Sequence, residues 1–437
     1  MAAFTFGARF LGAVREMFVA RHFGTSDQVD AFVLALAVCT FVFGVVAPPA
    51  GGALVPTYVA LRDREGPAEA ERLFSTTMLA SAALFAVTAA VVAAALPILL
   101  PILTPQFSPE KRHLTATLTA WLLPGFALSG LTTCWTGVLN AHGRFAAPAA
   151  AAAVVPVTAI AALVRFGHAW GISALVVGLV AGYALEAAIV AAVLRARRLR
   201  VLPRWWREVR GFRTVLGQYA PMVAGSLIMG GNPIIDQVMA ARLAPGSVAA
   251  LGYGAKVYSF AAGIATVALS AAIFPHYAAL TASRDWDRLS RTIRDWAVLV
   301  LVVTVPATIV GVVFSEDLVR LLFQRGAFTA ADTLVTARIQ AFYMLQAPFH
   351  LGSIVLVRFV TASNGNRFLV WVSSLNAVAN VIGNYVLSAR LGVAGIALST
   401  SLVQALAFAV LLLHVRRRLR LLRGTDPLEA EARSETA

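Results

Sequence analysis

Charged side chains lie inside otherwise apolar segments of this 437-residue chain, where they are costly and usually functional. They are Arg9, Arg15, Glu16, Asp30, Glu186, Asp236, Lys256 and Arg358. Arginine binds phosphate through two parallel hydrogen bonds, and lysine binds it as a point charge. A cavity that holds Arg9, Arg15 and Lys256 would therefore suit a diphosphate group, and it would not suit a cationic drug.

The spacing of the two N-terminal arginines limits how they can act together. Arg9 and Arg15 are six residues apart, which places them about 120° apart on a regular helix. Both can reach one cavity only through long side chains or local unwinding, which Gly7 and Gly12 would permit. Arg9 and Glu16 are seven residues apart and share a helix face, so a structural ion pair is the alternative.

A second group of polar residues lies in the second half of the chain. Asn376, Asn380 and Asn384 follow at i, i+4 and i+8 and line one face of a helix. With Asp236 and the hydroxyl of Thr400, they offer the hard oxygen ligands that small cations prefer. The alternative is that these groups form hydrogen bonds between helices.

Motifs of known catalytic chemistry are missing from the sequence. It contains no His-x-x-x-His, no Gly-x-Ser-x-Gly, no phosphate-binding loop and no Gly-x-Gly-x-x-Gly. We therefore expect no enzyme, no organic cofactor and no transport driven by ATP on this chain. An integral-membrane enzyme is the alternative that this absence disfavours.

The elements that carry these residues are membrane helices. Hydrophobic residues make up 59% of the chain and charged residues 13%, and apolar stretches long enough to cross a bilayer recur throughout. Helices satisfy their own backbone in lipid, so the fold class is an all-α polytopic membrane protein. Twelve helices are predicted, at 4–23, 29–60, 74–103, 114–140, 145–168, 171–196, 211–241, 248–281, 292–322, 333–362, 367–389 and 392–415. Pro48-Pro49 with Gly51-Gly52, and Asn232-Pro233, predict a break or a kink in two of them.

The chain repeats itself at an offset of 219–223 residues. Val19-Ala20-Arg21 recurs as Ala240-Ala241-Arg242, and His142–Phe145 recurs as Gly365–Phe368. Two halves of like orientation predict two six-helix lobes related by a pseudo-twofold axis, an organisation typical of transporters. The predicted parts are an N-terminal lobe (1–200), a basic linker (201–213), a C-terminal lobe (214–420) and a disordered polar tail (421–437).

Basic residues gather in alternate loops, which explains the net charge of +15 without nucleic acid as a partner. Because positive loops face the cytoplasm, we expect both termini and the linker there, in a multi-pass plasma-membrane protein. The linker sequence Leu202-Pro203-Arg204-Trp205-Trp206-Arg207 suits a segment in the headgroup layer with anionic lipid as its partner. A basic loop that only fixes topology is the alternative.

Four sequence blocks resemble one transporter family. They are Leu322-Phe323-Gln324-Arg325-Gly326-Ala327-Phe328-Thr329-Ala330-Ala331-Asp332-Thr333; Arg9–Arg15 with Ala20–Gly24; Asp30-Ala31-Phe32; and Gly246-Ser247-Val248 with Tyr253–Lys256. Together they resemble the MurJ/MviN lipid II flippases of the multidrug/oligosaccharidyl-lipid/polysaccharide exporter superfamily. The resemblance covers nearly the whole chain.

The resemblance implies a flippase that moves an undecaprenyl-diphosphate-linked saccharide, such as lipid II, across the bacterial plasma membrane by alternating access. Arg9 and Arg15 match cations of the family's central cavity, and Lys256 stands where the family has another cavity arginine. Asp30 matches an acidic position that we assign to the substrate site. The sodium site of some members matches Asp236, Asn376, Asn380 and, more loosely, Thr400. Proteins of cell-wall or polysaccharide synthesis are the protein partners that this interpretation allows.

Two departures from the family pattern leave alternatives open. The segment Ala37–Gly44 lacks an arginine that the family places in its cavity, and twelve helices are expected where the family has fourteen. The alternatives are a flippase for another polyprenyl-linked polysaccharide repeat unit, an inactive scaffold that binds the precursor, and a cation-coupled drug exporter. The N-terminal cations argue against the drug exporter.

Overall fold

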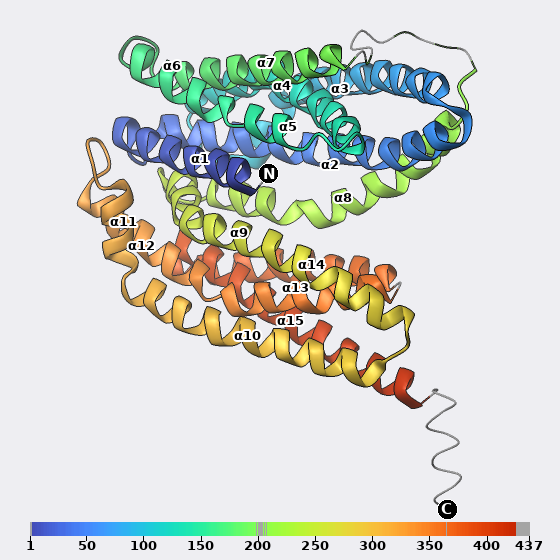
Figure 1. Cartoon of the computed structure of the whole chain (residues 1–437). Helices are drawn as coiled ribbons and strands as arrows, with labels where there is room; N and C mark the ends of the chain where they lie inside the picture. The colour runs from blue at the N-terminus through green and yellow to red at the C-terminus, as the bar shows by residue number, and fades with distance from the viewer. Residues whose placement is uncertain are drawn as a thin grey trace, which may run out of the picture. The chain divides into compact units, whose positions relative to one another are not determined.

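The computed structural model describes residues 2–197, 199, 204, 206, 208–363 and 365–424, and almost all of them are helical. The first helices are α1 (Ala2–Phe23), α2 (Asp27–Glu65), α3 (Pro67–Leu103), α4 (Pro109–Ala141), α5 (Ala146–Ala151), α6 (Val154–Trp170), α7 (Ile172–Ala196) and α8 (Phe212–Ala240) (Figure 1). The others are α9 (Ser247–Ala282), α10 (Trp286–Val313), α11 (Ser315–Phe323), α12 (Ala330–Met344), α13 (Ala347–Ala362), α14 (Asn366–Leu391) and α15 (Val393–Gly424). The predicted all-α class is confirmed.

Each of the twelve predicted segments is helical, but three of them consist of two helices. The segment 145–168 contains α5 and α6, and 333–362 contains α12 and α13. The prediction of a single helix over 292–322 is wrong, because α10 ends before Phe314 and α11 begins at Ser315. Glu316 and Asp317 occupy the first turn of α11, where acidic side chains favour a new helix start.

Ten helical segments of the described residues are long and apolar enough to cross a membrane. The exceptions among the twelve predicted segments are α1 and α8, which are long but less apolar. The sequence repeat makes α1 and α8 counterparts; α1 carries Arg9, Arg15 and Glu16, and α8 carries Asp236 near its end. The chain is a polytopic membrane protein in which the helix that opens each sequence repeat falls outside the ten most apolar segments.

The proline-rich positions do not end the helices that contain them. Helix α2 continues through Pro48, Pro49 and Pro56, and α8 continues through Pro233. A break at these points is therefore wrong, and a kink in a continuous helix is the alternative that remains. Each of these prolines still removes one backbone donor from the helix.

The first compact unit contains Met1–Ala249 and Phe323–Asp332. Helix α2 lies at its centre and packs against α3, α4 and α8, while α7 packs against α4 and α6 (Figure 1). The rings of Phe43, Phe85 and Phe126 form part of the core. This arrangement surrounds α2 with helices and leaves α1 against α5 and α6.

The second compact unit contains Ala250–Leu322 and Thr333–Ala437. Its core is built by α9, α10, α13, α14 and α15, and the fully buried side chains include Tyr277, Leu289 and Phe359. Helix α8 belongs to the first unit, although the repeat assigns it to the second lobe. The lobe boundaries at 200 and 214 stay a prediction. The predicted tail beyond residue 424, and linker residues 201–203, 205 and 207, lie outside the described residues.

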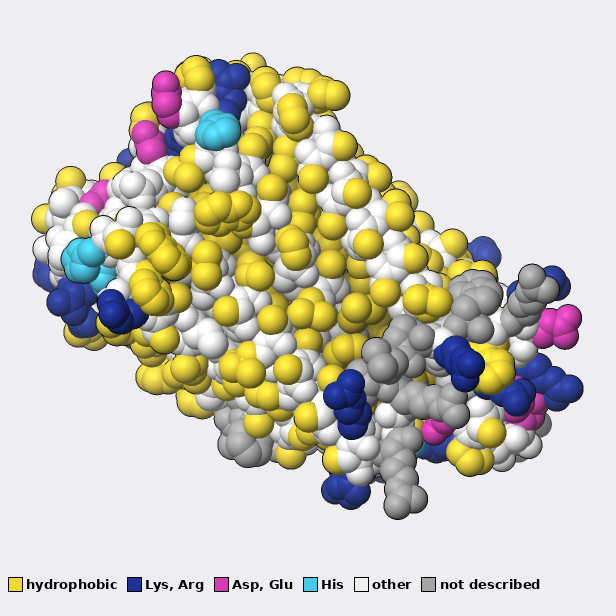
Figure 2. Space-filling model, turned by 90° about the horizontal axis from the view of Figure 1, so that it is seen from above, with side chains coloured by type: hydrophobic (Ala, Val, Ile, Leu, Met, Phe, Trp, Pro, Cys, Tyr) yellow, Lys and Arg dark blue, Asp and Glu magenta, His cyan; other side chains and the backbone are white. Residues whose placement is uncertain are grey.

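A broad hydrophobic surface covers the face shown in Figure 2, and charged side chains gather at its ends. Exposed apolar residues of the first unit include Val91 and Ile98 on α3, Val164 on α6 and Val177 on α7. Apolar exposure on this scale would be unfavourable in water and is favourable against lipid tails.

Candidate functional site

Arg15 forms an ion pair with its neighbour Glu16 on α1. The two side chains are only 14% and 8% exposed. The Nε atom of Arg15 is also buried and has no hydrogen-bond partner among the described residues. A buried donor without a partner is costly, so this edge of the guanidinium is suited to an anionic ligand.

Arg9 lies elsewhere on the same helix. Helix α1 is unbroken through Gly7 and Gly12, so no unwinding turns the two arginines to one side. Arg9 is exposed, about 120° around the helix from Arg15. The structure thus brings Arg15 together with Glu16 and leaves Arg9 on another face.

Asp30 is the centre of a closed cluster at the start of α2, and we call it the Asp30 cluster. Its carboxylate, 1% exposed, accepts hydrogen bonds from Lys111 Nζ (2.6 Å), the Gly246 amide (2.7 Å) and the Ala249 amide (2.7 Å). Lys111 also reaches Asp27 at 2.5 Å. In this structure Asp30 binds the protein itself, and its assignment to the substrate site stays a prediction.

The most family-specific sequence block, residues 323–332, packs beside this cluster. The Ala327 amide donates to the Arg21 carbonyl at 2.8 Å, and the Thr25 hydroxyl donates to Asp332. Asp332 also accepts from the amide and hydroxyl of Thr329, each at 2.8 Å, which caps the start of α12. The block therefore has a structural role in the first unit, although the chain on both sides belongs to the second.

Two glycines allow residues 323–332 to pack closely against the backbone at the end of α1. Gly24 (φ +55°) and Gly326 (φ +62°) both adopt the left-handed region. A Cβ atom at Gly24 would collide with the Ala327 carbonyl, and one at Gly326 would collide with the Arg21 carbonyl. Glycine is required at both positions for conformation and for space.

The predicted cation ligands are divided between the two units. Asp236 is buried on α8 in the first unit, whereas Asn376, Asn380 and Thr400 lie in the second. Asn380 accepts from the Asn384 amide at 3.2 Å, and both side chains are fully buried. The Thr400 hydroxyl donates to the Ile396 carbonyl at 3.0 Å. The amide oxygen of Asn376 is buried without a hydrogen-bond partner among the described residues.

The remaining membrane-depth cations lie in the second unit. Lys256 is half-buried on α9. Arg358, on α13, donates to the Ser270 hydroxyl at 2.7 Å. Lys256 belongs to the second unit, and its role beside the arginines of α1 stays a prediction.

Comparisons with known proteins agree with this architecture. The family model for the lipid II flippase MurJ matches residues 19–428. The chain is 28% identical to the probable lipid II flippase MurJ of Synechocystis sp. over 96% of this chain and 81% of the relative. The lipid II flippase MurJ of Burkholderia cenocepacia is 25% identical, over 96% and 83%.

The chain belongs to the lipid II flippase MurJ family. Its fold resembles a solved MurJ structure in an inward closed conformation, with a TM-score of 0.82 and 20% identity over 95% of this chain and 87% of that one. It also resembles an inward-facing MATE family multidrug transporter of the MOP superfamily, with a TM-score of 0.78 and 12% identity over 96% of both chains. The MurJ match begins at residue 19, so Arg9 and Arg15 lie before the matched range.

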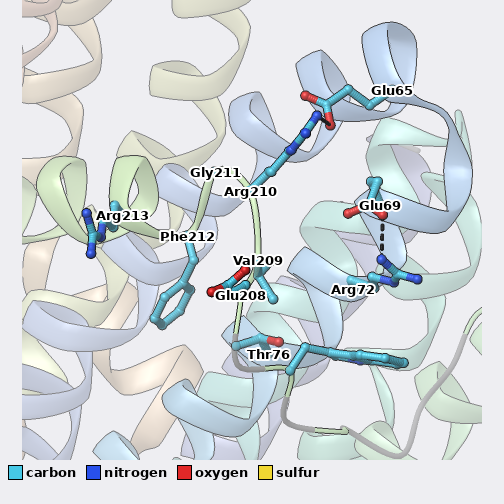
Figure 3. A pocket seen from close by; sticks show the side chains of 11 residues that line it. Glu65, Glu69, Arg72, Thr76, Glu208, Val209, Arg210, Gly211, Phe212 and Arg213 are labelled. Carbon is cyan, nitrogen blue, oxygen red and sulfur yellow. Dashed lines mark hydrogen bonds and ion pairs between the residues drawn. The ribbon is translucent and has the colours of Figure 1, made fainter.

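A pocket of about 960 Å³ lies where the described part of the linker meets α2 and α3 (Figure 3). Arg210 pairs with Glu65 at 2.9 Å, and this hydrogen bond and the negative charge raise the pKa of Arg210 above its ordinary value. Arg72 pairs with Glu69 at 2.6 Å and lies over the Trp206 ring at 5.0 Å. Carboxylates and guanidinium groups therefore alternate at this surface of a MurJ family member.

Two features of the structure were not predicted from the sequence: the role of Lys111 and the hydroxyl groups of α4 around Glu186. Lys111 counts as a loop charge in the sequence, yet it is 5% exposed and is the main partner of Asp30. Glu186 is recognisable in the sequence as a charge at membrane depth, but the hydroxyl groups around it come from another helix. The sequence could have placed Lys111 in the first turn of a helix, because Pro109 favours a helix start two residues earlier. It could not have identified Asp30 as the partner of Lys111.

Proposed function

We propose that this chain moves lipid II, a polyprenyl-diphosphate-linked saccharide, across the bacterial plasma membrane. The observation that supports the proposal most is the match of the lipid II flippase family over residues 19–428. This is a family of transporters and not of catalytic enzymes. The many membrane helices suit a carrier that exposes a site alternately to each side.

In the proposed mechanism, Arg15 binds the diphosphate. Its Nε atom is an uncommitted buried donor, and one other guanidinium nitrogen is held by Glu16. Glu16 balances the buried positive charge until the anionic headgroup arrives, and the diphosphate then competes for the guanidinium. Arg9 and Lys256 supply further positive charge, and an interior-negative potential favours outward movement by about 2.3 kcal/mol per charge per 100 mV.

The test is an Arg15→Ala variant in sealed vesicles that contain fluorescent lipid II. We expect loss of flipping without loss of folded protein, and partial activity in Arg15→Lys, because lysine keeps the charge but not the two-bond geometry. Arg165→Ala is the control, since Arg165 is an exposed arginine on α6. Flipping at the wild-type rate in Arg15→Ala would overturn the assignment.

We further propose that a sodium ion binds at Asp236, Asn376, Asn380 and Thr400 and helps the carrier return. The buried, unpartnered amide oxygen of Asn376 supports this proposal, because sodium requires oxygen ligands. Replacement of sodium by choline should slow flipping in the wild type, and Asp236→Asn should remove that dependence. A wild-type rate that is the same in both salts contradicts a sodium site.

The orientation proposed is that of the positive-inside rule, with both termini and the linker in the cytoplasm. Labelling of a cysteine introduced at each terminus, from one side of sealed cells, tests it. We also propose anionic lipid as the partner of the linker, supported by Trp206 and by Arg204, whose guanidinium lies 5.9 Å from the Trp206 ring centre. Partners among proteins of cell-wall synthesis stay a prediction.

A further inference from the structure

An open cavity of about 300 Å³, lined by both polar and apolar side chains, lies in the first unit between α4, α5 and α7. It is lined by Ser129, Thr132, Thr133, Thr136 and Asn140 of α4, Glu186 of α7, and Phe145, Pro148, Ala149 and Ala152 at α5. Helices in lipid rarely gather this many hydroxyl groups around a carboxylate without a ligand or a water-filled path. The phosphate chemistry assigned to Arg15 does not use any of these residues.

The α4 residues form one continuous face that can hydrogen-bond. Their spacing of three, four, seven and eleven residues from Ser129 follows the helix period. The hydroxyls of Thr132 and Thr133 donate to carbonyls of their own helix, each at 3.0 Å, which leaves their oxygens free to accept. The amide oxygen of Asn140 is buried and has no hydrogen-bond partner among the described residues. The face thus presents hydroxyl and amide groups, which can both accept and donate hydrogen bonds.

Helix α7 links the cavity to the surroundings of Arg15. Tyr183 interacts electrostatically both with Arg15 and with Glu186, which lies one turn further along α7. In a polyprenyl diphosphate saccharide the first sugar is bonded directly to the diphosphate. We therefore place the diphosphate at Arg15 and the first sugar on the side of Glu186 and the α4 face.

We propose that this cavity binds the sugar hydroxyls of the lipid-linked saccharide, with Glu186 and Asn140 as the main acceptors. The proposal rests on the proposed function, because it needs the diphosphate at Arg15. Sugar hydroxyls both donate and accept, so they can satisfy the unpartnered oxygen of Asn140 and the carboxylate of Glu186. The exposed ring of Phe145 offers an apolar surface to the carbon face of a sugar. A volume of about 300 Å³ is at the small end of ligand pockets, and it far exceeds the space of one dehydrated cation.

The experiment compares two probes on the purified full chain in lipid nanodiscs. The probes are undecaprenyl diphosphate and the same lipid with one attached sugar. We expect the wild type to bind the sugar-bearing lipid about tenfold more tightly, and Glu186→Ala or Asn140→Ala to lose that preference while they keep affinity for the bare lipid. Thr117→Val, on α4 but outside the cavity lining, is the matched control and should keep the preference.

Further variants separate the possible failures. Arg15→Ala should weaken both probes equally, whereas Glu186→Gln should keep most of the preference, because an amide still hydrogen-bonds to hydroxyls. A wild type that binds both probes equally overturns the sugar site and leaves the proposed function intact. A wild type that binds neither probe overturns both. Loss of the preference in Glu186→Gln, together with sodium-dependent binding, would assign the cavity to a cation and overturn the sugar site.

Discussion

The Asp30 cluster and the Arg15–Glu16 pair both place a basic and an acidic side chain in the first unit. They differ in how completely the hydrogen-bonding groups of the charged side chains are paired. Asp30 is 1% exposed and accepts from one ammonium and two backbone amides. Arg15 is 14% exposed, and its buried Nε atom has no hydrogen-bond partner among the described residues. A charge that the protein satisfies completely holds helices together, whereas a charge left partly unsatisfied is available to a ligand.

The comparison is tested most strongly by removing Asp30. Asp30→Ala leaves Lys111 buried without its main partner, so we expect a loss of about 3–5 kcal/mol in the free energy of unfolding. Asp27 bonds to the same Lys111 nitrogen but is 61% exposed, so Asp27→Ala should cost no more than about 1 kcal/mol. Denaturation of the purified variants in one detergent measures both. Equal losses would mean that burial does not distinguish the two carboxylates.

The loop packed beside the Asp30 cluster gives the second test. Gly326→Ala must strain a left-handed backbone and push the Arg21 carbonyl away. We expect this overpacking to lower the free energy of unfolding by about 1–3 kcal/mol. Gly143→Ala is the control, since its φ of +71° imposes similar strain and no described atom lies within 4 Å of the added Cβ. Gly326→Ala should melt at a lower temperature than Gly143→Ala, and residues 323–332 should be cleaved faster by protease in Gly326→Ala. Identical melting temperatures would show that the loop packing contributes nothing.

The helices and the charged positions were predictable because both follow from local sequence. An apolar run long enough to cross a bilayer must be helical. The repeat showed which segment of the second half corresponds to each segment of the first. The end of α10 was missed because Phe314 interrupts the helix inside a run that stays apolar up to Ser315. The continuity of α2 through Pro48 and Pro49 was open, because packing against its neighbours decides between a kink and a break.

Partners were much less predictable than positions. The sequence marks Asp30 as costly to bury, but its partners are Lys111, 81 residues away, and two amides more than 200 residues away. The seven-residue spacing of Arg9 and Glu16 suggested a pair, yet Glu16 accepts from its immediate neighbour Arg15. The cavity around Glu186 needs α4 and α7 side by side, and only tertiary packing provides that.

The smallest effect is expected at an exposed ion pair of the same unit, Arg210–Glu65 in the linker pocket. Its distance of 2.9 Å resembles that of Lys111–Asp30, but the side chains are 76% and 31% exposed. Glu65→Gln should therefore leave the melting temperature unchanged in neutral lipid, because water already screens the pair. The same change releases Arg210, so stabilisation by added anionic lipid should increase. Glu316→Gln removes one of the two exposed ion pairs of Arg320 on α11 and should not respond to anionic lipid in this way. A melting temperature that rises equally in both variants, or in neither, would remove the linker as a specific lipid contact and leave it a loop that fixes topology.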